Sequence, residues 1–230
     1  MEKYVEIEKD GETVLVKSKE WAEYQSNARE EVTVSTSGLP IHVKGLTLDN
    51  YIGTNRSIPR KLKKYVEEFS EKYCHVHLYF WSHENGTQKT TTASIVGNLL
   101  SKAGKTVRFV LMGDLLKLLT DSSFEEEKKQ KVAEYKTCDF LIVDDSFDKK
   151  KATIYQSGYQ ISFLDQFLRD RLECTRRATC FTSNFSIDEI DENVFGISLK
   201  KLVKRSIIDP FEFTTSYEER NRFNPDDLWG

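Results

Sequence analysis

Apolar and polar residues follow two different periods along this chain, one typical of strands and one typical of helices. The short apolar runs that predict strands are residues 76–81, 106–112, 139–143 and 178–182. The longer periodic segments that predict helices are residues 90–103, 114–119, 161–173 and 199–204, with a charged helix through 125–129. Regular alternation of strand and helix predicts an α/β fold, in which a parallel sheet is covered by helices on both faces.

Segments at both ends extend this pattern. Pro59 opens a predicted helix with one apolar face, and residues 207–213 can supply a fifth strand around Pro210. Near the N-terminus, an Asp10-Gly11 turn joins two short strand signals, which is too little for an independent domain. We therefore predict a short N-terminal segment, residues 1–37, followed by one large domain, residues 38–230.

The composition is that of a chain that can fold around a core, but it does not indicate a binding partner. The 230 residues are 38% hydrophobic, which is enough to fill a core, and carry a formal net charge of -3 from 34 basic and 37 acidic residues. That balance is not the global signature of nucleic-acid binding, so any basic surface must be local. No apolar run approaches the roughly 18 residues that cross a bilayer, so we expect no membrane association and a cytoplasmic location.

The segment from His83 to Thr90 has the layout of a phosphate-binding loop, G-x-x-x-x-G-K-[ST], between a predicted strand and a predicted helix. Both usual glycines are replaced, the first by His83 and the second by Gln88. A side chain where glycine is usual costs about 1 kcal/mol or blocks the pocket, so nucleotide binding is either retained, weakened or lost.

The same loop contains groups that suit a nucleoside triphosphate. Backbone N–H groups at the turn into the helix can hold phosphates, Lys89 adds a cation at the outer phosphates, and the Thr90 hydroxyl suits Mg²⁺. The predicted nucleotide-binding residues are Asn85, Gly86, Thr87, Gln88, Lys89 and Thr90.

Two adjacent carboxylates follow the apolar run at 140–143. At the end of a buried strand, Asp144 is expected to hold Mg²⁺ together with Thr90, and Asp145 to orient or activate an attacking water. Alone, such a pair is as easily a solvated strand end; its position after a glycine-and-lysine loop makes the combination specific.

Taken together, four segments resemble the AAA+ ATPases that load replicative helicases, the DnaC/DnaI group, with the IstB transposition ATPases as close relatives. These segments are 78–81, 86–90, 140–145 and 181–186, and the resemblance covers residues 38–213. It implies the fold of the P-loop NTPases and a role for Asn184 in sensing the terminal phosphate. It also implies an arginine that completes a neighbouring subunit's site, best matched by Arg205, and a second sensor arginine, either Arg220 or Arg222.

The resemblance implies an ATP-dependent protein that acts in DNA replication. We expect it to be encoded by a phage or another mobile element. With ATP and Mg²⁺, and as a homo-oligomer, such a protein would load a replicative helicase onto single-stranded DNA. The alternatives are an IstB-like transposition ATPase and a non-catalytic AAA+ adaptor whose phosphate loop is disabled at Gln88. The candidate DNA-contacting residues are Arg56, Arg60, Lys61, Lys63, Lys64, Lys149, Lys150 and Lys151, although lysine runs are also common on solvated faces.

Overall fold

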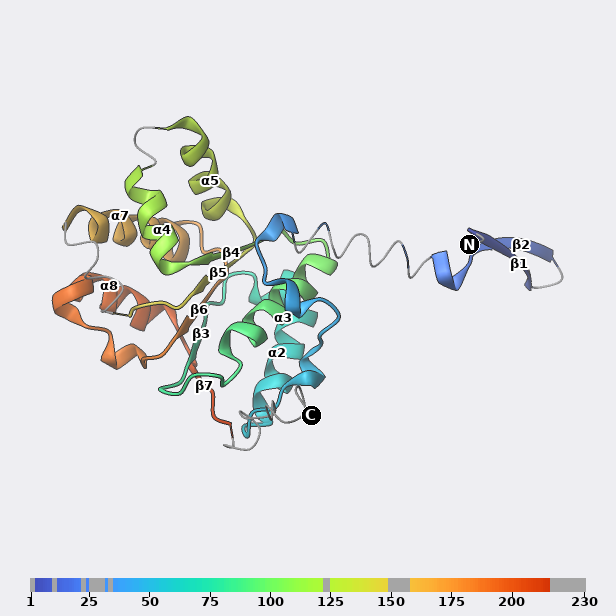
Figure 1. The fold of residues 1–230 in the computed structure, drawn as a ribbon, viewed down its shortest axis with the longest axis horizontal. Coiled ribbons are helices and arrows are strands. Elements are labelled where there is room, and N and C mark those ends of the chain that lie inside the picture. The colour runs from blue at the N-terminus through green and yellow to red at the C-terminus, as the bar shows by residue number, and fades with distance from the viewer. Residues whose placement is uncertain are drawn as a thin grey trace, which may run out of the picture.

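The computed structural model describes residues 3–9, 12–21, 24, 32, 35–121, 125–148 and 158–215. Its centre is a five-stranded, all-parallel sheet in the order β4-β5-β6-β3-β7 (Figure 1). The strands are β3 (Leu78–Trp81), β4 (Val107–Leu111), β5 (Phe140–Asp144), β6 (Thr179–Ser183) and β7 (Phe211–Glu212). The chain therefore crosses back over the sheet repeatedly, as an alternating strand–helix sequence requires.

Helices cover both faces of this sheet (Figure 1). The helices are α2 (Ser57–Glu67), α3 (Lys89–Lys102), α4 (Met112–Asp121), α5 (Glu126–Thr137), α7 (Gly158–Arg169) and α8 (Glu192–Ser206). Shorter helical turns are η1 (Ile41–Val43), η2 (Leu48–Asn50), η3 (Phe69–Tyr73), η4 (Asp170–Cys174) and η5 (Ile187–Glu189). The layers confirm the predicted α/β fold, a parallel sheet between two helical layers.

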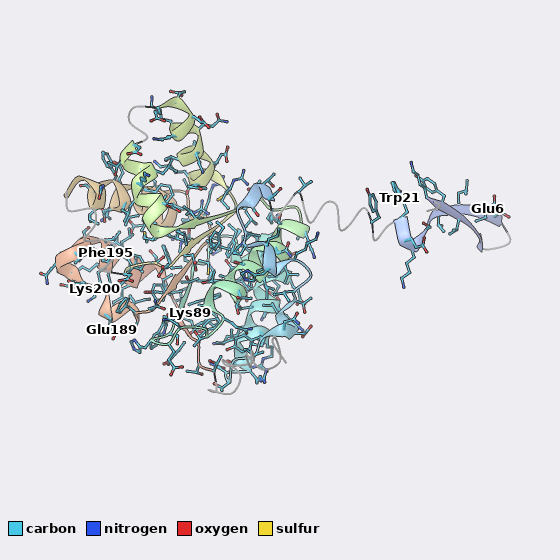
Figure 2. All side chains as sticks on the ribbon, in the orientation of Figure 1. Glu6, Trp21, Lys89, Glu189, Phe195 and Lys200 are labelled. Atoms are coloured by element: carbon cyan, nitrogen blue, oxygen red, sulfur yellow. The ribbon has the colours of Figure 1, made fainter. Side chains whose placement is uncertain are left out.

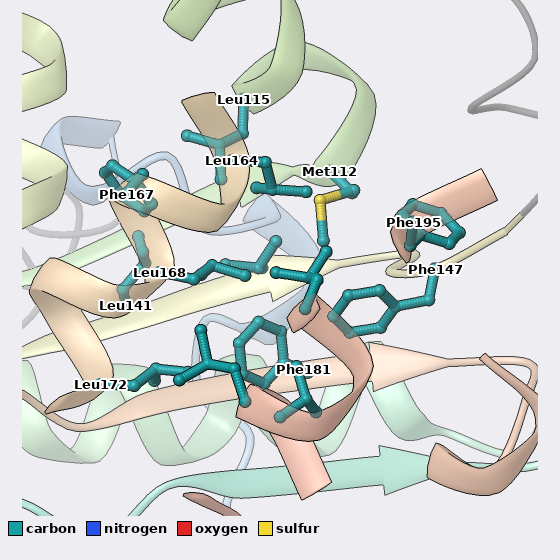
Figure 3. Close-up of a cluster of buried hydrophobic side chains, with 14 of the residues drawn as sticks. Met112, Leu115, Leu141, Phe147, Leu164, Phe167, Leu168, Leu172, Phe181 and Phe195 are labelled. Carbon is teal, nitrogen blue, oxygen red and sulfur yellow. The ribbon is translucent and has the colours of Figure 1, made fainter. Parts of the chain in front are cut away.

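The inner strand β5, between β4 and β6, shows how the apolar pattern produces two cores. Phe140 and Ile142 pack in a cluster with side chains of α2 and α3, whereas Leu141 and Val143 pack in a second cluster with α4, α7 and α8. Figure 3 shows part of the second cluster. Because consecutive strand side chains point to opposite faces, an unbroken apolar strand is needed where both faces are covered.

The predicted elements are present, but two helices in the second half of the chain differ from the prediction in their extent. The helix expected over 199–204 begins at Glu192, where the Asp191 carboxylate accepts a hydrogen bond from the backbone N–H of Asn193 at 3.0 Å. Gly196, with φ 80°, breaks the helical geometry within it and masks its periodicity in the sequence. The expected helix over 161–173 changes at Arg169 from α-helix to the wider turn η4.

The fifth strand is shorter than the segment that predicted it. Ile207 forms one isolated bridge with His77, and regular pairing resumes at β7, which lies beside Phe80 and Trp81 of β3. Pro210 separates the two pieces because it has no N–H to donate.

The N-terminal strand signals form the antiparallel pair β1 (Tyr4–Lys9) and β2 (Glu12–Lys17), apart from the main sheet in Figure 1. The Asp10-Gly11 turn predicted between them lies outside the described residues. The Nζ atom of Lys3 lies 5.0 Å from the centroid of the Trp21 ring, and Trp21 stacks on Tyr24. The boundary between residues 1–37 and the large domain stays a prediction. None of the described helices is both long and apolar enough to span a bilayer.

One charged side chain, Arg171, is fully buried between α5 and β6. Its guanidinium donates hydrogen bonds of 2.7–3.0 Å to four backbone carbonyls and to the Thr179 hydroxyl. Three of these carbonyls, those of Tyr135, Lys136 and Cys138, are at the C-terminal end of α5, where helical carbonyls lack partners within the helix. Arg171 therefore closes the end of a helix from inside the protein, although burial lowers its pKa.

Replacing Arg171 with Met should lower the free energy of unfolding by about 2–4 kcal/mol, because several buried carbonyls lose their donor. Urea unfolding monitored by circular dichroism measures this change. Arg176→Met, at an exposed position in the loop that follows, is the matched control and should change stability by less than about 0.5 kcal/mol. Equal stability of the two variants would contradict this account.

Candidate functional site

A cavity of about 460 Å³ lies at the carboxyl edge of the sheet, where β3, β5 and β6 end. Figure 2 labels Lys89 among the side chains of this region. The lining residues are Asn85, Gly86, Thr87, Gln88, Lys89, Thr90, Thr91, Asp144, Asp145, Thr182, Ser183 and Asn184. The structure thus brings together the predicted nucleotide-binding residues, the predicted Mg²⁺ ligands Thr90 and Asp144, and Asp145 and Asn184, at the edge where parallel α/β sheets bind ligands.

The loop between β3 and α3 depends on two left-handed residues. Gly86 has φ 74°, which glycine adopts without cost. Gln88 has φ 65° and ψ 18°, and this left-handed residue starts α3, with its carbonyl accepting from the Thr92 N–H at 2.8 Å. The replacement at Gln88 therefore falls where glycine is favoured, and costs about 1–2 kcal/mol of conformational energy.

His83, the other replacement, does not obstruct the cavity. It is not among the lining residues, its backbone φ is not positive, and its side chain is 57% exposed. The ring packs edge-on against Trp81 and lies 3.6 Å from the Glu189 carboxylate. The first glycine of the pattern is therefore not required by the conformation of this loop.

Lys89 is buried within the loop, on the first turn of α3. Its Nζ donates hydrogen bonds to the carbonyls of Glu84 at 3.0 Å and Ser82 at 3.4 Å, and to the Thr87 hydroxyl at 3.3 Å. Burial lowers the pKa of Lys89 to about 8, although the nearby Asp144 and Glu84 carboxylates favour the charged form. A partly desolvated cation at a helix N-terminus is a strong attractor for an anion.

The Asp144 carboxylate joins three elements of the fold. Its Oδ1 atom accepts a hydrogen bond of 2.7 Å from the Thr90 hydroxyl of α3 and a second hydrogen bond from the Thr182 hydroxyl of β6. The same Thr182 hydroxyl accepts a 3.0 Å hydrogen bond from the backbone N–H of Asp145. Sequence reasoning assigned no role to Thr182, since a threonine in a strand is ordinary and only the sheet order places it beside Asp144.

The backbone after β5 is strained. Asp145 and Phe147 have φ values of 56° and 63°, which non-glycine residues rarely adopt. The Phe147 ring is buried against Tyr79, Phe181 and Phe195, so packing over-determines the turn and keeps Asp145 at the cavity wall.

The arginines lie elsewhere. Arg205, near the end of α8, does not line the cavity and forms an ion pair with Glu173 while remaining 54% exposed. A role for Arg205 in a neighbouring subunit's site therefore stays a prediction. The candidates for a second sensor, Arg220 and Arg222, lie outside the described residues, as does the lysine run at 149–151.

No family model matches this chain. It is 24% identical over 196 residues to the replicative helicase loader DnaC of Escherichia coli K12, a match that covers 79% of this chain and 76% of the relative. A crystal structure of DnaI superposes with a TM-score of 0.59 at 18% identity, covering 77% of this chain and 92% of that one. The chain resembles the AAA+ helicase loaders.

A third similar structure is that of a replication initiator. The structure of DnaA bound to AMPPCP and single-stranded DNA has a TM-score of 0.60 and 18% identity, and covers 77% of this chain. The chain spans about half the length of two of the replication-initiator structures that it matches, 54% of one and 51% of the other. These neighbours confirm an AAA+ P-loop fold.

The donor set of this site fits Mg²⁺ and a phosphate group. The hydroxyl of Thr90 and the carboxylate of Asp144 are hard oxygen ligands within 2.7 Å of each other, and Mg²⁺ characteristically takes one or two such ligands and completes its shell with phosphate and water. Lys89 and the backbone around Gly86 supply positive potential beside them.

Thr182→Val should lower the free energy of unfolding by about 1–3 kcal/mol, because the buried Asp144 carboxylate loses one donor and the Asp145 N–H loses its acceptor. Thr182→Ser keeps the hydroxyl and is the matched control, with a loss of at most about 1 kcal/mol expected from the missing methyl group. Urea unfolding of the two variants side by side makes the comparison. A valine variant as stable as the serine variant would contradict the bridging role of Thr182.

Proposed function

We propose that this chain binds ATP with Mg²⁺ in the cavity at the carboxyl edge of the sheet and uses that binding to load a replicative helicase onto single-stranded DNA. The observation that carries the proposal is the convergence of Lys89, Thr90 and Asp144 in one cavity. The resemblance to the helicase loader DnaC supports the role in replication, and the AMPPCP-bound neighbour supports the nucleotide.

In the proposed site each residue has a separate task. Backbone N–H groups between Gly86 and Lys89 bind the phosphates, and the Lys89 ammonium neutralises charge on the outer ones. Thr90 and Asp144 would hold Mg²⁺, which would supply positive charge to offset that of the phosphates. Hydrolysis would need a positioned water.

The residues that would carry hydrolysis are Asp145, Asn184 and Arg205. Asp145 and Asn184 line the cavity and can orient water and the terminal phosphate. Arg205 is exposed on α8 of its own chain, so it would reach phosphate only across a subunit interface of a homo-oligomer. Hydrolysis would then depend on assembly.

The proposed DNA contact is the basic start of α2. Arg56, Arg60 and Lys63 line one cavity of about 330 Å³. Lys61 and Lys63 form ion pairs of 2.7 Å with Asp209 and Asp49, so part of the charge is already balanced. Arg60 has no ion-pair partner among the described residues, and is the best candidate for a backbone phosphate.

A fluorescent ATP analogue with Mg²⁺ should bind the chain, and Lys89→Ala should weaken binding at least tenfold by removing the buried cation. Because phosphate binds the protonated lysine, affinity of the unaltered chain should be constant below pH 8 and fall as pH rises above the Lys89 pKa of about 8. Fluorescence anisotropy from pH 6.5 to about 9.5 measures both effects. The alanine variant, which lacks the titrating group, should show no such fall.

Absence of analogue binding by the unaltered chain would contradict the proposal and favour the non-catalytic adaptor. The strained Gln88 conformation is the observation behind that second candidate. Equal affinity of the chain and its Lys89→Ala variant would place the nucleotide elsewhere.

Loading itself should be measurable as helicase transferred to a circular single-stranded DNA coated with single-strand binding protein. We expect ATP to stimulate unwinding by a purified replicative helicase when this chain is added, and Arg60→Glu to reduce that stimulation while leaving ATP affinity unchanged. Lys102→Glu, on the distant end of α3, is the charge-matched control. Equally strong stimulation by the Arg60→Glu variant would contradict a DNA contact at α2.

A further inference from the structure

The side chain of Gln88 makes a long-range contact that the phosphate-loop pattern does not contain. Its Oε1 atom accepts a 3.0 Å hydrogen bond from the backbone N–H of Ile52, a residue 36 positions earlier in the chain. Gln88 is the N-cap residue of α3, but its side chain forms no capping hydrogen bond with that helix. The carboxamide is thus directed to the segment between η2 and α2.

That segment is fixed from several sides. The Tyr51 carbonyl accepts a 3.0 Å hydrogen bond from Arg56 Nη1, and the Tyr51 ring is 4% exposed and packs edge-on against Phe213. The Thr54 N–H donates to the Thr214 carbonyl at 2.9 Å, just beyond β7. The Ile52 N–H therefore belongs to a well-anchored segment, and the Gln88 contact restrains the loop.

From these contacts we infer that Gln88 is a positioning residue, which holds the phosphate loop in its left-handed turn through the Ile52 N–H. Glycine reaches this conformation freely but does not hold it; glutamine is strained there but is anchored by its own side chain. The loop would then be ordered before nucleotide arrives, and it would move together with the start of α2. This inference rests on the proposed nucleotide binding.

Two substitutions separate the anchor from the strain. Gln88→Gly and Gln88→Asn both favour positive φ, and neither reaches Ile52, since asparagine is one methylene shorter. If strain at Gln88 decided affinity, both variants would bind the fluorescent ATP analogue more tightly than the unaltered chain. If the anchor decides it, both should bind about 3- to 10-fold more weakly, the range of one neutral hydrogen bond.

Amide hydrogen exchange at Ile52, followed by NMR without nucleotide, reports the contact itself. The Ile52 amide should be protected in the unaltered chain and in Gln88→Glu, which keeps an acceptor oxygen at the same reach, and should exchange faster in the glycine and asparagine variants. Thermal unfolding of each variant checks that the fold is retained.

The outcomes separate the two claims. Weaker binding with faster Ile52 exchange supports the inference, whereas equal or tighter binding in both variants overturns it. If the unaltered chain binds no nucleotide, the proposed function fails, and the exchange experiment alone decides the anchor: unchanged Ile52 exchange in the glycine and asparagine variants would overturn it, and faster exchange would support it.

Discussion

The carboxylate of Asp144 is the group on which the arrangement of the site depends. It lies at the end of a fully buried strand and accepts hydrogen bonds from Thr90 of α3 and Thr182 of β6. Three segments that are distant in the sequence therefore meet at one buried carboxylate. A buried charge is costly unless it is hydrogen-bonded, so the same contacts that satisfy Asp144 also align the start of α3 with the edge of the sheet. Stability and site geometry are coupled here.

Much of the fold could be predicted from the apolar pattern. The strand β5 is recognisable because a parallel strand covered on both faces must be apolar at every position, and its residues from Phe140 to Val143 meet that condition. The α8 helix was harder to predict, since Gly196 interrupts its period. Nor does local sequence reveal that Ile207 bridges to His77, just before β3, while Phe211 pairs with Phe80 of β3, because the sheet order decides that pairing.

The site was predictable where chemistry is local. The run from Gly86 to Thr90 and the acid pair after β5 carry their own signal, and the structure places them in one cavity. Contacts between segments were not predictable from the same reasoning. Thr182 faces Asp144 only because β6 lies beside β5, and the anchor between Gln88 and Ile52 depends on how the segment before α2 packs. The effect of replacing a motif residue, such as glycine by Gln88, can be interpreted only when the contacts of the new side chain are known.

Titration calorimetry of ATP with and without Mg²⁺, on the unaltered chain and on Thr90→Val, tests the central claim most directly. If Thr90 and Asp144 hold Mg²⁺ against bound phosphate, adding Mg²⁺ should tighten ATP binding by the unaltered chain and have little effect on the valine variant. Thr90→Ser, which keeps the hydroxyl, should behave like the unaltered chain. Equal Mg²⁺ dependence in all three proteins, or no ATP binding by the unaltered chain, would contradict the account.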